Sequence, residues 1–151
     1  MGRRYVQNKA KMRPDLQEQS NVTSIVGRLP AKIGLVDDDH SIRKAVGRLL
    51  HSHGFLCKTY ESADEALADP ELREMDCLVL DIHLEGSSGF ELRNRLREMR
   101  INIPHIFITA LTEPDSREWV QQVEGTPCLG KPFEEWELVT LLRALLDART
   151  Q

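Results

Sequence analysis

From residue 33 onward, five short apolar runs alternate with segments in which apolar residues recur at helical spacing. The run at 77–80 is apolar without alternation, as expected for a strand that is covered on both faces of a parallel sheet. Such an order predicts consecutive β–α units with helices on both faces of one sheet. The predicted fold is therefore α/β, a doubly wound five-stranded parallel sheet of the (βα)5 type. The expected strands cover residues 33–36, 55–60, 77–80, 106–108 and 126–129, and the expected helices lie near 42–50, 62–67, 90–99, 112–123 and 133–146.

Capping residues support several of these helix boundaries. Ser62 is followed three residues later by Glu65, which is the spacing of a capping box. Thr112 is followed at the same spacing by Asp115 and is predicted to cap the helix at 112–123. Gly54 is predicted to end the first helix, because glycine is favoured just after a helix C-terminus. Asp39 is predicted to cap the start of that helix.

Charge divides the chain into two parts. Residues 1–32 contain seven Lys or Arg and two Asp or Glu, whereas residues 33–151 contain 13 and 22. We predict a flexible basic N-terminal extension, 1–32, followed by one domain, 33–151; a basic partner-binding arm is the functional alternative for the extension. The domain is acidic and the chain has only eight aromatic residues, so direct nucleic-acid binding is not expected.

The cellular compartment is predicted from the absence of membrane-spanning, secretion and paired-cysteine patterns in the sequence. No apolar run approaches the roughly 20 residues that span a bilayer, and no secretion signal follows the N-terminal basic residues. The three cysteines are widely spaced and form no C-x-x-C pair, which argues against a disulfide framework or a zinc knuckle. We therefore expect a cytoplasmic protein without membrane contact.

Polar side chains follow four of the five expected strands. Asp37 and Asp38 come directly after the first strand, Asp81 after the third, Thr109 after the fourth and Lys131 shortly after the fifth. Ligands of doubly wound sheets bind outside the carboxyl ends of the strands. We therefore expect these side chains to meet at one edge of the sheet.

The chemistry of such a cluster is restricted. Three neighbouring carboxylates cannot all ionise unless a cation or protons offset their repulsion. Mg²⁺, or Mn²⁺, suits oxygen ligands and leaves coordination positions for a phosphate oxygen, and a carboxylate can itself become the nucleophile. Each residue alone has a simpler reading, as a helix cap, a strand residue or a solvated charge, but their joint placement favours a phosphoryl-transfer site.

The order of four motifs resembles the receiver domain of bacterial two-component response regulators, over about residues 33–149. The stretch 101–104 and the loop 86–89 look most like receivers of the FixJ type. The resemblance implies a flavodoxin/CheY-like version of the predicted fold. The matching motifs are Val36-Asp37-Asp38-Asp39, Leu78-Val79-Leu80-Asp81 with Gly89 eight residues later, Ile108-Thr109-Ala110, and Leu129-Gly130-Lys131-Pro132-Phe133.

The resemblance implies a magnesium site. Asp38 would bind the ion directly, beside Asp81 and the backbone carbonyl of His83. Asp37 would act through a metal-bound water.

It also implies a phosphate site and a function. Asp81 would be the phosphoacceptor for a phosphohistidine on a sensor histidine kinase. Thr109 and Lys131 would engage the phosphoryl group, together with the backbone N–H groups of His83 and Ala110. The activity would be autocatalytic phosphotransfer with slow self-hydrolysis, not turnover of an independent substrate, and it would switch the conformation that a downstream output protein or domain reads.

Two positions depart from the family pattern. Glu85 stands where receivers usually carry proline, and Cys128 stands at the switch position that is usually aromatic. They support an alternative, a pseudo-receiver that acts as an interaction module without phosphorylation. A third reading, a hydrolase of the haloacid dehalogenase type, is disfavoured because His83 stands where such enzymes need a second aspartate.

Further expectations concern assembly and backbone. The resemblance implies a cis peptide between Lys131 and Pro132, and a homodimer formed on phosphorylation through the fourth and fifth helices, with Arg117 and Trp119 as candidate contacts. The pattern ends close to residue 151, so no DNA-binding output domain is expected within this segment.

Overall fold

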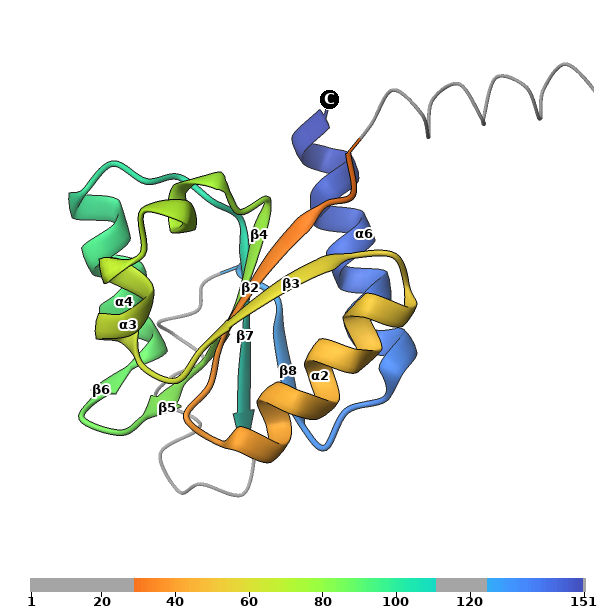
Figure 1. The fold of residues 1–151 in the computed structure, drawn as a ribbon, viewed down its shortest axis with the longest axis horizontal. Coiled ribbons are helices and arrows are strands. Elements are labelled where there is room, and N and C mark those ends of the chain that lie inside the picture. Colours follow the sequence, from red (N-terminus) through yellow and green to blue (C-terminus); the bar gives the residue numbers. More distant parts are fainter. Residues whose placement is uncertain (1–28, 111–124, 151) are drawn as a thin grey trace, which may run out of the picture. The chain divides into compact units, whose positions relative to one another are not determined.

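The computed structural model describes residues 29–110 and 125–150, and its helices and strands belong to one compact unit, residues 31–151 (Figure 1). Most of the predicted extension and the predicted helix at 112–123 lie outside the described residues, as do Thr112, Arg117 and Trp119. The strands are β2 (Lys32–Val36), β3 (Leu56–Tyr60), β4 (Cys77–Asp81), β5 (His83–Leu84), β6 (Ser87–Ser88), β7 (His105–Ala110) and β8 (Cys128–Lys131). The helices are α2 (His40–Ser52), α3 (Ala63–Ala68), the 3-10 helix η2 (Pro70–Glu74), α4 (Gly89–Glu98) and α6 (Glu135–Thr150).

The main sheet has five parallel strands in the order β3-β2-β4-β7-β8. This confirms the predicted doubly wound α/β fold. The chain leaves β2 for one edge and then returns to build β4, β7 and β8 on the other side, so the strand order reverses between β2 and β4. In folds of this kind, that reversal opens a crevice at the carboxyl ends of the two strands.

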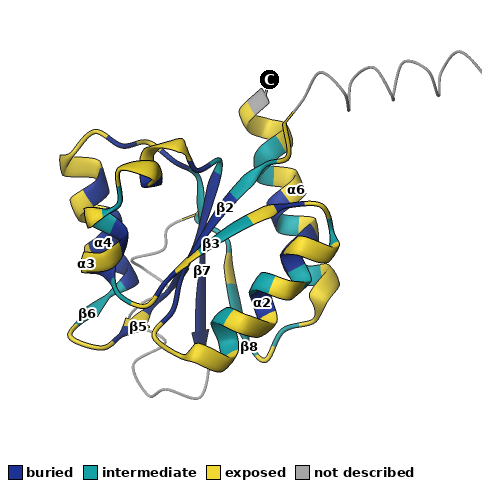
Figure 2. Ribbon diagram, viewed as in Figure 1, coloured by how far each residue is buried: buried dark blue, intermediate teal, exposed yellow. Residues whose placement is uncertain are grey.

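Side chains along each strand alternate between two apolar layers. Ile33 and Leu35 of β2 join a cluster with α2 and α6, whereas Val36 joins a second cluster with α3 and α4. Figure 1 shows these helix pairs on opposite sides of the sheet, and Figure 2 shows that the central strands are buried almost throughout. Burial on both faces explains why the run at 77–80 is apolar without alternation.

The predicted caps of the first two helices are confirmed. Asp39 caps α2, with its Oδ1 accepting a hydrogen bond from the Ser41 N–H at 2.8 Å. Ser62 caps α3, with its Oγ accepting from the Glu65 N–H at 3.0 Å. The Glu65 carboxylate reaches back to the N–H of Glu61, one residue before the cap, so the capping box is closed one position earlier than predicted.

The fifth strand lies two residues later than predicted. It was expected at 126–129, before Lys131, but β8 includes Lys131 as its last residue. Its length is set by pairing with β7, from Phe107 opposite Cys128 to Ala110 opposite Lys131. The apolar pattern could not show this, because the pairing extends through a glycine and a lysine.

Two short elements have no predicted counterpart. The loop expected at 86–89 contains β6, which pairs with β5 in an antiparallel hairpin whose turn places Gly86 at φ +76°. The 3-10 helix η2 is capped by Asp69, whose Oδ1 accepts from the Glu71 N–H at 3.0 Å. Both elements are too short for sequence periodicity to detect. No helix in the described part of the chain is long and apolar enough to cross a membrane.

Candidate functional site: an acidic cluster at the carboxyl edge of the sheet

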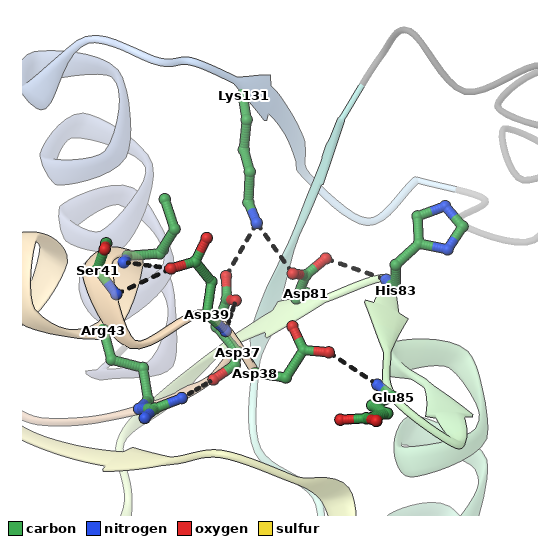
Figure 3. A network of polar contacts seen from close by, with 10 residues as sticks. Asp37, Asp38, Asp39, Ser41, Arg43, Asp81, His83, Glu85 and Lys131 are labelled. Atoms are coloured by element: carbon green, nitrogen blue, oxygen red, sulfur yellow. Dashed lines mark hydrogen bonds and ion pairs between the residues drawn. The ribbon is translucent and has the colours of Figure 1, made fainter.

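Four of the predicted site residues meet where the strand order reverses (Figure 3). Asp81 is the last residue of β4, Asp37 and Asp38 follow β2 directly, and Lys131 ends β8. Because the strands are parallel, residues far apart in sequence reach the same edge. We call Asp37, Asp38, Asp81 and Lys131 the acidic cluster.

Lys131 bridges two buried carboxylates. Its Nζ lies 2.9 Å from Asp37 Oδ2 and 2.9 Å from Asp81 Oδ2. Asp37 is 0% exposed and Asp81 is 4% exposed, so neither charge is well solvated. One ammonium therefore offsets two carboxylates, and the cluster keeps an excess of negative charge when all its acids are ionised.

Burial changes the acid strength of these groups. The pKa of Asp81 is raised to about 6; loss of solvent is the largest cause and the Asp37 charge adds to it, while hydrogen bonds from Lys131 and the His83 N–H act in the opposite direction. Burial alone would lower the pKa of Lys131, but its hydrogen bonds to Asp81 and Asp37 outweigh this and raise it. At neutral pH the lysine is therefore protonated and Asp81 is mostly ionised, which is the state needed for a nucleophile.

Asp37 is held by its neighbours on both sides of the turn. Its Oδ1 accepts a hydrogen bond from the Asp39 N–H at 2.9 Å, and its backbone carbonyl accepts one from Arg43 Nη1 at 2.8 Å. Neither donor was predicted from the sequence, because one is a backbone group and the other depends on how α2 leaves the turn.

The other two carboxylates are held by the β5–β6 hairpin. The His83 N–H donates to Asp81 Oδ1 at 3.0 Å, and the Glu85 N–H donates to Asp38 Oδ2 at 2.9 Å. A proline at position 85 could not make the second bond, since it has no N–H. The departure at Glu85 therefore gives Asp38 an anchor, which sequence motifs alone did not reveal.

The three carboxylates fit a hard divalent cation. One oxygen of each of Asp37, Asp38 and Asp81 can be chosen such that all lie within 4.8 Å of one another. Oxygen ligands with a surplus of negative charge are the set that Mg²⁺ and Mn²⁺ prefer. Asp38 is exposed, so one side of the set is open to solvent.

Thr109 occupies the end of β7 next to this set. Its residue is 2% exposed, and its Oγ1 is buried without a hydrogen-bond partner among the described residues. A buried hydroxyl without a partner is unfavourable, and such groups often mark a functional site. Ala110 follows and pairs in register with Lys131, so Thr109 and Ala110 lie at the same edge of the sheet as the cluster.

Gly89 allows the chain to pass close to the backbone of Asp81. A Cβ at this position would lie 2.6 Å from the backbone oxygen of Asp81, which is closer than any real side chain can approach. The Gly89 N–H donates to the Ile82 carbonyl at 2.9 Å and so ties the start of α4 to the segment after β4. Glycine is required here by the close approach of two backbones.

Two further expectations concern β8. The Lys131–Pro132 peptide is cis, as predicted. Cys128 is exposed and lies opposite Phe107 in the sheet, so its small side chain occupies the predicted switch position at the outer strand.

Curated proteins similar to this chain are bacterial regulators. The phosphate regulon transcriptional regulatory protein PhoB of Pseudomonas aeruginosa is 36% identical over 114 residues, covering 74% of this chain and 50% of that protein. Nodulation protein W of Bradyrhizobium diazoefficiens is 35% identical over 119 residues, with 78% and 52% covered, and the transcriptional regulatory protein FixJ of Rhizobium meliloti is 32% identical over 108 residues, with 71% and 52% covered. The chain thus spans about half the length of these three relatives.

Solved structures agree with the sequence comparison. The receiver protein of a response regulator from Burkholderia phymatum has a TM-score of 0.66 at 36% identity, with 78% of this chain and 95% of that chain covered. The chemotaxis protein CheY4 of Vibrio cholerae has a TM-score of 0.68 at 29% identity, with 78% and 99% covered. The family model of the response regulator receiver domain matches residues 33–143. The chain therefore belongs to the response regulator receiver domain family of bacterial two-component systems.

Proposed function

We propose that Asp81 accepts a phosphoryl group from a phosphohistidine on a sensor histidine kinase, with Mg²⁺ as cofactor. The observation that carries this proposal is the placement of Lys131, 2.9 Å from both Asp37 and Asp81, beside a third carboxylate that completes a cation-binding set. Such an arrangement can position a phosphoryl group and neutralise its charge, which are the main requirements for phosphoryl transfer.

In the transfer step, a carboxylate oxygen of Asp81 attacks the phosphorus of the donor. The new O–P bond forms as the P–N bond of the phosphohistidine breaks, and the bonding electron pair stays with the imidazole nitrogen. Asp38 and Asp81 would bind Mg²⁺ directly, and Asp37 would act through a metal-bound water. When bound, the ion supplies positive charge against the phosphoryl oxygens. The backbone carbonyl of His83 is the proposed further ligand.

The remaining groups act on the phosphoryl oxygens. Lys131 gives up part of its contact with Asp81 and pairs with a phosphoryl oxygen, while Thr109 finds the hydrogen-bond partner that its hydroxyl lacks among the described residues. The N–H groups of His83 and Ala110 are the proposed backbone donors. Attack by water on phosphorus then breaks the O–P bond to Asp81, releases inorganic phosphate and returns the free carboxylate, and this slow reaction ends the signal.

Phosphorylation would bias a conformational equilibrium. The added dianion favours whichever state lets Thr109 and Lys131 engage it, so the effect is a population shift within one fold. We propose that a downstream output protein or domain reads this shift in the cytoplasm, and that the phosphorylated chain can form a homodimer. Cys128 lacks the ring that would couple such a shift to β8, so the readout surface differs from that of receivers with an aromatic residue there.

The decisive experiment is phosphorylation by a small phosphodonor. The full chain is incubated with acetyl phosphate or phosphoramidate, with Mg²⁺ or with EDTA, and its intact mass is measured. We expect a gain of one phosphoryl mass that needs Mg²⁺ and is abolished by Asp81→Asn. The matched control is Asp69→Asn, which makes the same substitution at an aspartate outside the cluster and should leave the reaction intact.

Two other outcomes would contradict the proposal. No mass gain in the wild-type chain, with its fold intact, would favour a pseudo-receiver that signals without phosphate. Sustained turnover of a generic phosphate ester would favour a metal-dependent hydrolase instead.

A further inference from the structure

The carboxylate of Asp38 is held differently from the other two carboxylates of the acidic cluster. In Asp37 and Asp81, each oxygen accepts a hydrogen bond, one from Lys131 and the other from a backbone N–H. Asp38 is exposed, and among the described residues only the Glu85 N–H donates to its side chain, at 2.9 Å. The placement of this carboxylate therefore depends on one backbone donor.

The donor belongs to the turn of the β5–β6 hairpin. The facing pair Leu84 and Ser87 closes a two-residue turn of Glu85 and Gly86. Gly86 has φ +76°, and in the described part of the chain Arg100 is the only non-glycine residue with a positive φ, so the φ of Glu85 is negative. A negative φ followed by a positive φ is the pattern of a type II turn. In that turn the N–H of the second residue takes no part in the turn's own hydrogen bond, so it can serve the cluster.

The same turn permits a substitution that removes the donor with little change of backbone. Proline is favoured at the second position of a type II turn. The residue before a proline must be extended, and Leu84 already is, because it belongs to β5. Proline therefore fits position 85, but it has no N–H to give to Asp38.

The hydrogen bond also sets which oxygen of Asp38 faces the cluster. Oδ2 is turned to the hairpin, and Figure 3 shows the other oxygen on the side of Asp81. A carboxylate that is fixed through one oxygen favours coordination of an ion through the other. Mg²⁺ needs short distances and near-octahedral geometry, whereas Ca²⁺ takes more oxygens at longer distances and often both oxygens of one carboxylate.

We propose that the Glu85 N–H is a positioning group that presents one oxygen of Asp38 to the cation and thereby favours Mg²⁺ over Ca²⁺. This inference rests on the proposed function, which assigns Mg²⁺ to the acidic cluster. It adds that the ion preference comes from a backbone donor in the hairpin and not from the Glu85 side chain, which is exposed. Without the donor, Asp38 would rotate freely and could offer both oxygens to a larger ion.

The test compares Glu85→Pro with Glu85→Ala, which removes the same side chain but keeps the N–H. Mg²⁺ and Ca²⁺ are titrated separately into the full chains at pH 7.5 and constant ionic strength, and binding is followed by amide chemical shifts. We expect Glu85→Pro to bind Mg²⁺ about fivefold more weakly than Glu85→Ala does, the size expected for the loss of one hydrogen bond. Ca²⁺ affinity should differ by less than about twofold between the two variants, because Ca²⁺ can use the second oxygen of the freed carboxylate. Glu85→Ala should keep the ion preference of the wild type.

A measurement without divalent ions tests the hydrogen bond itself. In EDTA, Asp38→Ala removes the acceptor, so the amide proton of Glu85 should move to a lower chemical shift. The amide proton of His83, which bonds to Asp81, is the internal control and should move far less. This measurement needs no proline variant, so it tests the inference even where Glu85→Pro lowers stability.

The outcomes separate this inference from the proposed function. Equal Mg²⁺ affinities in folded Glu85→Pro and Glu85→Ala would contradict the inference and leave the proposed function intact. Equal weakening of both ions by proline would indicate a general disturbance of the site and would also contradict it. An unchanged Glu85 amide shift in Asp38→Ala would show that the hydrogen bond does not form in solution. A wild-type chain that binds neither ion would overturn both this inference and the proposed dependence on Mg²⁺.

Discussion

Two lysines of this domain, Lys131 and Lys58, each form ion pairs with two carboxylates. The pKa of one acid is raised in the first group, whereas the pKa of one acid is lowered in the second. Lys131 lies 2.9 Å from Asp37 and 2.9 Å from Asp81 at the carboxyl edge of the sheet. Lys58 on β3 lies 2.7 Å from Asp69 and 3.3 Å from Glu71. In each group one ammonium contacts two carboxylates, yet one acid of each group has its pKa shifted in the opposite direction to the other.

The difference is visible in one acid of each group. The pKa of Asp69 is lowered to about 2 by hydrogen bonds from Lys58, from the Tyr60 hydroxyl at 2.7 Å and from the Glu71 N–H. The pKa of Asp81 is raised to about 6, chiefly by burial. Hydrogen bonds to a charged group favour ionisation, and removal of water opposes it.

The comparison separates an ion pair with exposed members from the ion pair of the proposed functional site. Around Lys58, the lysine and Glu71 are exposed to solvent and Asp69 accepts hydrogen bonds from further donors, so the group ties β3 to the cap of η2 with its charges favoured. In the acidic cluster, two buried carboxylates share one ammonium, and a third lies within reach. Such a cluster has a surplus of negative charge and could bind a further cation, as a metal-dependent site would.

The largest expected effect is the removal of Lys131, which bridges the two buried carboxylates. Lys131→Met keeps most of the side-chain stem but leaves Asp37 and Asp81 without their shared counter-charge, so we expect a loss of about 3 kcal/mol of unfolding free energy at pH 7.5 in EDTA. Urea denaturation measures this directly. Saturating Mg²⁺ should restore part of the loss, because it can replace the missing positive charge.

The control for this experiment is Lys58→Met in the exposed group. Its side chain is 42% exposed, Glu71 is 63% exposed, and Asp69 keeps the donors Tyr60 and the Glu71 N–H after the change, so we expect only a small effect on stability and none on the response to Mg²⁺. Equal losses in the two variants would show that burial does not distinguish the two groups.

The strands and the carboxylates of the acidic cluster were predicted from the sequence, because an apolar run and the residue that ends it are local features. An apolar run that stops at a carboxylate is visible in Leu80-Asp81, and the topology of a parallel sheet then brings distant strand ends together. The end of β8 was misplaced because strand pairing, and not composition, includes Lys131 in the sheet.

What the sequence did not predict depends on backbone groups. The N–H groups of Asp39 and Glu85 position Asp37 and Asp38, and any non-proline residue could supply them. The network around Lys58 was missed for a similar reason, since η2 brings Glu71 to the lysine through a turn too short to show periodicity. Side-chain identity predicts the chemistry of a site, whereas turn geometry decides its precise contacts.

A smaller effect is expected from Asp81→Asn, and it has a characteristic pH dependence. The folded-state pKa of Asp81 is about 6, above the 3.8 of an exposed aspartate, so the folded protein binds more protons than the unfolded chain between about pH 4 and pH 6. Wild-type stability therefore falls as pH rises through this window. Asparagine lacks this titration, so the variant should become more stable than the wild type by about 1 to 3 kcal/mol above pH 6.

Urea denaturation of both proteins from pH 4 to pH 8 in EDTA measures this difference. The gap should grow from pH 4 to pH 6 and stay level above pH 6. A variant that is less stable than the wild type at pH 8 would contradict the assignment of a raised pKa to Asp81.

The smallest effect, with the opposite sign, is expected from Asp69→Asn. The folded-state pKa of Asp69 is about 2, so its contribution to stability is fully present above about pH 4 and is lost as pH falls toward 2. The variant should be slightly less stable than the wild type at pH 7, and the gap in thermal midpoint should shrink between pH 4 and pH 3. Tyr60→Phe removes one of the donors to Asp69 and should reproduce part of this change.

Because the group around Lys58 is open to solvent, added salt should also narrow the gap in stability between Asp69→Asn and the wild type, whereas the effect of Asp81→Asn should resist salt. Stability changes of the same sign in the two aspartate variants would break the contrast between the buried and the exposed lysine groups.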